Sequence, residues 1–392
     1  MALKPTLALL RNILLFAAVL LMLDVFFVSI SLMGAFKSIG SGYGKELFNN
    51  LAHNPYIGLL MGILITSIIQ SSSTTTSLVV GLVAGGAMGS TTEEAIALAI
   101  PIVMGANIGT SVTNAIVSLT HIGRPEEFKR AFSSAIVHDF FNLLCVFILF
   151  PLQLATNFLG RSSVWLARAF ADASGTRFSS PIKTLIAPQK ALVTSWMQHD
   201  FAIQFVVFAV LVYLVFRMLE FFNKRQQNEA SNELLFLFGA LAVGLVMTLA
   251  NKYSEVIFHS ATATFVLALS FLFISLVVFV KLMRFLVLDK VELLFHRFVF
   301  RNAITGLLFG VVVTAIVQSS SVTTSIVVPL AGAGILNIHQ IFPYTLGANI
   351  GTTITALLAA FAAGEVSGVA FAFAHTLFIF LVPLFPFPPP PF

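Results

Sequence analysis

The chain has 392 residues, of which 58% are hydrophobic and only 9% are charged, whereas roughly a quarter of the residues of a soluble protein carry a charge. This composition excludes an ordinary soluble domain and predicts an all-α, polytopic membrane protein. The formal net charge of +5 requires no nucleic acid, because membrane proteins keep Lys and Arg in cytoplasmic loops. We therefore expect the lipid bilayer as a partner and no nucleic-acid partner.

Apolar runs of about the length that crosses a bilayer recur along the chain. The first, at residues 11–33, is too long for the core of a signal peptide and carries Asp24, so it is interpreted as a spanning helix. The sequence leaves two roles open for Asp24. It lies on a pathway for cations, or it forms a hydrogen bond with a neighbouring helix. The single Cys145 is expected to pack inertly. Further spans are expected at residues 94–118, 131–152, 202–222, 233–250, 262–283, 341–362 and 366–386.

A polar motif interrupts the apolar sequence and then returns. Gln70 begins Gln-Ser-Ser-Ser-Thr-Thr-Thr-Ser, and Gln318 begins Gln-Ser-Ser-Ser-Val-Thr-Thr-Ser. Residues 70–86 and 318–334 are identical at 11 of 17 positions. The matches include Gln, Ser, Thr and Gly, which chance pairing of apolar helices would not produce, so duplication is favoured. Buried hydroxyls and amides in a membrane are costly unless they bind something.

A second motif is also paired, at Gly105–Thr113 and Gly347–Thr355, with 7 of 9 positions identical. Its glycines flank Asn-Ile and predict a non-helical bend inside each spanning segment; close helix packing is the alternative. The threonines of each motif are three residues apart and share a face if helix resumes. With exposed carbonyls they would form an oxygen cage for a small cation.

Loop charges predict that the two copies have opposite orientations in the membrane. With Lys4 and Arg11 inside, the later basic loops also fall inside if residues 55–90 enter and leave on one face. An odd number of crossings then separates the copies, which is the inverted-repeat plan of secondary transporters. Both termini are predicted to be cytoplasmic, in a multi-pass protein of the cell (inner) membrane.

This plan divides the chain into two repeats and a connector. Each repeat is expected to contain a re-entrant helical hairpin and a broken transmembrane helix. The expected boundaries are 1–152 for repeat 1 (hairpin 55–90, broken helix 94–118), 153–232 for a connector with an interfacial segment and one spanning helix, 233–386 for repeat 2 (hairpin 302–336, broken helix 341–362), and 387–392 for a Pro-rich tail.

The chemistry of the motifs favours an anion held together with cations. Half-helices that end within the membrane leave unsatisfied N–H groups with partial positive charge, which suit an anion. Ser hydroxyls and Gln amides add neutral donors, and neither motif contains Lys or Arg. The charge of a divalent anion must then be balanced by bound cations, for which sodium is the natural candidate.

These motifs, together with Phe128-Lys-Arg-Ala-Phe and Val137-His-Asp-Phe-Phe-Asn142, resemble the type II sodium-dependent phosphate cotransporter family. The resemblance covers most of the chain outside the connector and implies sodium-driven uptake of inorganic phosphate by alternating access. Carried over by position, the phosphate site would contain Gln70, Ser71, Ser72, Ser73, Gln318, Ser319, Ser320 and Ser321. The sodium ligands would come from Asn107, Thr110, Thr113, Asp139, Asn142, Ser319, Ser320, Asn349, Thr352 and Thr355.

Asp139 bears on stoichiometry, because an acid inside an apolar run is by default a functional residue. In the family, an Asp at this position resembles the electrogenic members, which implies three sodium ions for each HPO₄²⁻. Pairing of Asp139 with a neighbouring donor is the alternative. The family pattern has Gln and Asp where this chain has His121 and Arg124, which puts one sodium site in question. The chain also lacks the long disulfide-bonded outer loop of mammalian members, which favours a bacterial relative.

The same motifs are compatible with other functions. The closest is a sodium-coupled carrier with the same architecture for another anion, a dicarboxylate or sulfate. An anion channel would conduct without sodium. A membrane enzyme is disfavoured, because no Ser-His-Asp arrangement is evident. No cofactor is expected beyond the co-transported sodium ions, and the oligomeric state is open, with a homodimer as one option.

Overall fold

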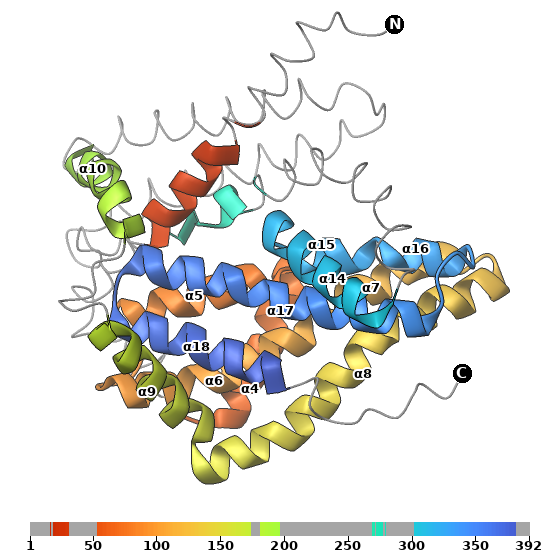
Figure 1. The fold of residues 1–392 in the computed structure, drawn as a ribbon, viewed down its shortest axis with the longest axis horizontal. Coiled ribbons are helices and arrows are strands. Elements are labelled where there is room, and N and C mark those ends of the chain that lie inside the picture. The colour runs from red at the N-terminus through yellow and green to blue at the C-terminus, as the bar shows by residue number, and fades with distance from the viewer. Residues whose placement is uncertain are drawn as a thin grey trace, which may run out of the picture.

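The structure, a computed structural model, describes residues 16, 19–30, 53–173, 181–196, 269–270, 272–276, 279 and 302–381. These residues form helices and short connections, with no β-strand among them (Figure 1). The predicted spans 202–222 and 233–250, and most of 262–283, lie outside the described residues. The elements are the helix Val19–Ile30, α4 (Pro55–Ile69), α5 (Ser72–Ala84), α6 (Thr92–Gly109), α7 (Ser111–Ser118), η2 (Leu119–His121), α8 (Pro125–Thr156), α9 (Phe158–Ala173), α10 (Pro181–Trp196), α14 (Ala303–Val317), α15 (Ser320–Ser325), α16 (Val327–Gly332), α17 (Ile338–Ala363) and α18 (Val366–Leu381).

Three of the described helical stretches are long and apolar enough to cross a membrane. They are Thr92–His121, Pro125–Thr156 and Ile338–Ala363, and they correspond to the spans expected at 94–118, 131–152 and 341–362. The run expected at 366–386 gives the shorter apolar helix α18. The membrane character inferred from composition is therefore supported by the helices themselves.

Each glutamine-led motif breaks its helix in the same way. Gln70 ends α4 with φ 59° and ψ 27°, and Gln318 ends α14 with φ 58° and ψ 25°. Positive φ is uncommon for a residue with a side chain. Ser71 and Ser319 then adopt extended backbone and begin α5 and α15. In both copies the Ser/Thr run therefore begins a new half-helix directly after its glutamine.

The broken helix predicted at the second motif is wrong for the second copy, whereas in the first copy the helix is interrupted at Thr110. In the second copy α17 runs without interruption through the motif. In the first copy only Thr110 separates α6 from α7, and its φ of −61° and ψ of −28° are helical values. The hydroxyls of Thr110 and Thr352 bond to carbonyls four residues earlier, so these polar side chains are accommodated on a helix.

The glycines of the second motif serve close packing instead of a bend. A Cβ atom built on Gly105 would lie 1.9 Å from the carbonyl oxygen of Leu59, and one on Gly347 would lie 1.9 Å from that of Leu307. Both distances are far shorter than any real contact, so only glycine fits. This absence of a side chain is what lets α6 lie directly against α4, and α17 against α14.

The two copies are interlocked by reciprocal packing. Within each copy the first half-helix packs on the long helix, α4 on α6 and α14 on α17. The second half-helices also pack on the other copy. α5 contacts α17 and α18, α15 contacts α7, and α16 contacts α7 and α8. Figure 1 shows the long α8 running from α9 to α16, in agreement with the contacts of α8 with both helices. The polar motifs of both copies are thereby brought into one region. The inverted orientation and the re-entrant hairpins stay predictions.

Candidate functional site

The first serine of each Gln-Ser-Ser-Ser motif is an N-cap. The Ser71 hydroxyl accepts hydrogen bonds from the backbone N–H of Thr74 at 3.2 Å and from its hydroxyl at 2.8 Å. The Ser319 hydroxyl accepts one from the backbone N–H of Val322 at 3.4 Å. These bonds satisfy backbone N–H groups in the first turn of each helix. The first serines therefore stabilise the break between the two half-helices.

The third serine of each motif differs from the first, because its hydroxyl makes no hydrogen bond. Ser73 and Ser321 are both buried, and neither hydroxyl has a hydrogen-bond partner. Buried polar atoms are nearly always paired, so a matched pair of unpaired hydroxyls points to a bound ligand. Ser72 and Ser320 beside them are also buried. Since α5 and α15 contact each other, the two helices that start with these serines meet in the interior.

The side-chain amides of the two motif glutamines donate hydrogen bonds to the last turns of their own helices. Each side-chain amide donates to a carbonyl three residues back, Gln70 to Ser67 and Gln318 to Ala315. The Gln70 carbonyl oxygen also accepts a hydrogen bond from the Thr113 hydroxyl at 2.7 Å. That bond ties the first motif to the helix that carries the second motif.

Three of the predicted sodium-binding threonines, Thr110, Thr352 and Thr355, are buried, and their hydroxyls are bonded differently. Thr110 and Thr352 donate to the carbonyls of Ala106 and Ala348, at 3.2 and 3.1 Å. The hydroxyl oxygens keep lone pairs that a cation can use. The hydroxyl of Thr355 is buried and has no hydrogen-bond partner. It is the one hydroxyl among the four predicted sodium-binding threonines that makes no hydrogen bond.

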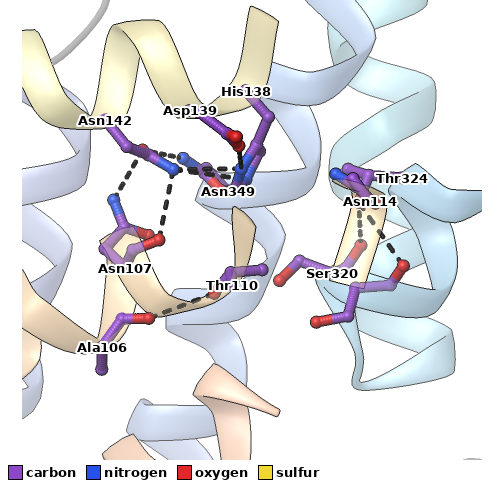
Figure 2. Close-up of polar contacts among 11 residues, drawn as sticks. Ala106, Asn107, Thr110, Asn114, His138, Asp139, Asn142, Ser320, Thr324 and Asn349 are labelled. Atoms are coloured by element: carbon purple, nitrogen blue, oxygen red, sulfur yellow. Dashed lines mark hydrogen bonds and ion pairs between the residues drawn. The ribbon is translucent and has the colours of Figure 1, made fainter. Parts of the chain in front are cut away.

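Three predicted asparagines meet in one buried cluster, shown in Figure 2. Asn107 and Asn349, which occupy the same position in the two copies of the second motif, both donate to Asn142 Oδ1 at 2.8 Å. Asn142 Nδ2 in turn approaches the backbone oxygen of Asn107 at 3.3 Å. The cluster therefore joins helices of both copies through a single amide.

His138 belongs to this cluster and was missed as a site residue. Its side chain is fully buried, and its Nε2 lies 3.0 Å from Asn349 Oδ1. The available signal was its position, four residues before Asn142 on the same helix face. Asp139, the predicted acid, is 22% exposed, and its Oδ1 lies 3.8 Å from His138 Nδ1, which is too long for a hydrogen bond.

A second link between the copies was also missed. The Thr324 hydroxyl donates to Asn114 Oδ1 at 3.1 Å, and both side chains are buried (Figure 2). Asn114 directly follows the second motif of the first copy, and Thr324 lies in the first motif of the second copy. The signal for this pair was the polar Asn114, which extends the second motif of the first copy by one residue.

His121 and Arg124 both contact Glu127 at the start of α8. His121 Nδ1 and Arg124 Nη1 both lie near Glu127 Oε2, at 3.2 and 3.1 Å. Nearby, Arg130 donates through Nε and Nη2 to the carbonyl oxygen of Gly332, at 3.0 and 2.9 Å. These side chains secure the start of α8 and the end of α16, away from the asparagine cluster.

Comparison with known proteins identifies the family. Residues 25–171 and 271–383, about two thirds of the chain, match the Na⁺/Pi-cotransporter family. The chain belongs to this family. The Na⁺/Pi-cotransporter family consists of transporters, which confirms that the chain is not an enzyme.

Individual relatives support the same assignment. Sodium-dependent phosphate transport protein 2B of Homo sapiens is 33% identical over 373 residues, covering 84% of this chain and 52% of the relative. The 2B protein of Bos taurus is 33% identical over 385 residues (88% and 54%), and the 2A protein of Rattus norvegicus is 31% identical over 358 residues (84% and 53%). The chain thus spans about half the length of these relatives. No solved structure matches it. The expected bacterial origin stays a prediction.

Proposed function

We propose that this chain takes up inorganic phosphate together with sodium, by alternating access. The observation that carries the proposal is the pair of buried, unpartnered hydroxyls of Ser73 and Ser321, at matched positions near the starts of two half-helices that touch. Hydroxyl donors beside helix N-termini suit an oxyanion. Relatives that carry the name sodium-dependent phosphate transport protein support phosphate as that oxyanion. Gln70–Ser73 and Gln318–Ser321 form the proposed phosphate site.

Sodium supplies the positive charge that the motifs lack. Neither Gln-Ser-Ser-Ser segment contains Lys or Arg, and an unbalanced dianion inside a membrane is very costly. One proposed sodium site uses oxygens of Ser319, Ser320, Thr352 and Thr355. A second lies near Thr110 and Thr113, with Asn107 and Asn349 at the junction between the two.

The motion that we propose is a displacement of one copy against the other. The reciprocal packing of α5 on α17 and of α15 on α7 supports a pseudo-two-fold relation between the copies. Inverted copies would present the same site to either side of the membrane in turn. The cytoplasmic placement of both termini belongs to this proposal.

We further propose three sodium ions for each HPO₄²⁻, with Asp139 serving the additional ion. Its half-buried carboxylate has one oxygen without a hydrogen-bond partner, which supports a role in binding a cation. Each cycle would then carry one net positive charge inward. A potential of 100 mV adds roughly 2.3 kcal/mol of drive for each such charge.

Uptake of labelled phosphate into proteoliposomes tests the function directly. An inward sodium gradient is expected to drive accumulation, and an equal potassium gradient is not. Excess arsenate should compete, whereas stronger competition by succinate or sulfate would assign the site to another anion. Uptake that is indifferent to sodium would contradict coupling.

The stoichiometry needs a separate measurement under a clamped potential. Phosphate uptake by the unaltered chain is expected to become faster when the interior of the proteoliposomes is made negative. Asp139→Gly should retain sodium-dependent uptake but lose this acceleration. An unchanged voltage response in that variant would reject the role of Asp139.

A further inference from the structure

Two contacts between the copies lie at opposite ends of the long helix α17. At one end, Arg130 donates through Nε and Nη2 to the carbonyl oxygen of Gly332, at 3.0 and 2.9 Å. At the other end, the Ser367 hydroxyl donates to the carbonyl oxygen of Val83 at 3.5 Å. Since α17 has 26 residues and an α-helix rises about 1.5 Å per residue, α17 is about 39 Å long. The two contacts are therefore separated by about the thickness of a bilayer.

Arg130 and Ser367 hold equivalent positions in the duplicated sequence. The helix that follows the second motif, α8 in the first copy and α18 in the second, carries one histidine in each case, His138 or His375. Arg130 and Ser367 both lie eight residues before that histidine. Each donor therefore connects the first part of its own helix with the end of a half-helix of the other copy, which is α16 for Arg130 and α5 for Ser367.

The apolar packing next to each contact is equivalent as well. Val328 and Val80 are matching positions of the first motif, and both are fully buried. Val328 packs in one cluster with Ala131, and a Cβ atom built on Gly368 would lie 3.7 Å from Val80. Ala131 and Gly368 directly follow the two hydrogen-bond donors. The two ends of α17 are thus built on one plan, so their contacts can be compared directly.

The two contacts differ in strength. Arg130 makes two bonds with a charged donor, and their acceptor lies at the carboxyl-terminal end of α16, where helix carbonyls carry partial negative charge. Gly332 also lies against the ring of His121, because a Cβ atom built on Gly332 would be 3.1 Å from that ring. Ser367 makes one bond with a neutral donor, and 3.5 Å is long for a hydroxyl donor. The copies are therefore held together more firmly where α8 begins than where α18 begins.

We call the contact of Arg130 with Gly332 the α8 gate and the contact of Ser367 with Val83 the α18 gate. An alternating-access carrier separates its copies at one face at a time, and the face with the weaker contact opens at the lower cost in free energy. We propose that Arg130 is a positioning residue that holds the α8 gate closed, so that the α18 gate opens first. The consequence for transport rests on the proposed function, whereas the difference between the gates does not. With both termini in the cytoplasm, as proposed, the α18 gate faces outward, which suits uptake.

Thiol labelling at the two matched valines tests the proposal. Val328→Cys and Val80→Cys are made separately, after Cys145→Ala has removed the one native cysteine. The rate of reaction with a water-soluble methanethiosulfonate is measured on the detergent-solubilised protein without phosphate, where the reagent reaches both faces. We expect Val80→Cys to react about tenfold faster than Val328→Cys, because opening of the α8 gate must also break hydrogen bonds with a charged donor.

Arg130→Ser gives the α8 gate the same donor as the α18 gate. We expect this change to raise the Val328→Cys rate about tenfold and to leave the Val80→Cys rate unchanged. Lys129→Ser is the matched control for charge, and neither rate should change in it. A Val328→Cys rate that is not below the Val80→Cys rate, or that does not respond to Arg130→Ser, would overturn the proposal.

Two further outcomes would also overturn it. An equal rise of both labelling rates in Arg130→Ser would show a general loosening of the protein, and an equal effect of Lys129→Ser would show an effect of charge alone. Because labelling requires neither sodium nor phosphate, it is independent of transport. A protein that shows the expected labelling rates but takes up no phosphate with sodium would overturn the proposed function and leave the difference between the gates in place.

Discussion

The contact between α4 and α6 predicts that one methyl group destabilises the protein. In Gly105→Ala the new Cβ would lie 1.9 Å from the carbonyl oxygen of Leu59, 2.9 Å from its carbonyl carbon and 3.0 Å from the nitrogen of Ile63. All three neighbours are main-chain atoms, which cannot rotate away. The two helices must therefore move apart by about 1.5 Å to bring the 1.9 Å approach to the roughly 3.4 Å of an ordinary contact.

The magnitude follows from two opposing effects. Overpacking typically costs about 1–3 kcal/mol, and a contact between two backbones belongs at the upper end, about 3 kcal/mol. Replacing glycine by alanine within a helix returns about 1 kcal/mol. The expected net loss is therefore about 2 kcal/mol, and Gly347→Ala, which meets the carbonyl oxygen of Leu307 at 1.9 Å, should lose a similar amount.

The assay is the thermal unfolding midpoint of the detergent-solubilised protein, followed by size-exclusion chromatography after heating. Gly123→Ala is the matched control, because a Cβ there meets nothing within 4 Å. We expect a midpoint lower by a few degrees in Gly105→Ala and in Gly347→Ala, and no change in Gly123→Ala. If Gly105→Ala were as stable as the control, glycine would serve conformational freedom, and the packing argument would be refuted.

Two further predictions use the same assay. Thr113→Val removes the donor to the glutamine of the first motif and should cost about 1 kcal/mol, whereas Thr355→Val removes an unpaired hydroxyl and should leave the midpoint unchanged while weakening sodium affinity. Equal midpoints for the two variants would contradict the bonding described. Arg130→Met removes both bonds to the Gly332 carbonyl and should cost about 1 kcal/mol, reduced by its exposure. Lys129→Met is the control, and a similar loss there would point to charge instead of this contact.

The sequence indicated weakened helices around Gln70 and Gln318, because a run of Ser and Thr competes for the hydrogen bonds that continue a helix, but it did not place the breaks at the glutamines themselves. It was misleading for Gly105 and Gly347. A glycine pattern does not reveal whether the missing Cβ serves a torsion angle or a close approach. The partner helix decides between them, and that helix is identified only by the packing of the fold.

The residues that were missed share a different cause. His138 bonds with Asn349 and Asn114 bonds with Thr324, and each pair is separated by more than 200 residues in the sequence. Local pattern can place such residues on a helix face, but it cannot name a partner on the other copy. Only the interlocked arrangement of the copies brings these side chains together.

The central claim is that both Gln-Ser-Ser-Ser breaks hold one phosphate ion between them. Equilibrium binding of labelled phosphate to the purified protein in saturating sodium tests this claim most directly. We expect one phosphate per chain, with Ser73→Ala and Ser321→Ala each weakening that single site by a similar factor. Two phosphates per chain, or a variant of either serine that binds as the unaltered chain does, would contradict it.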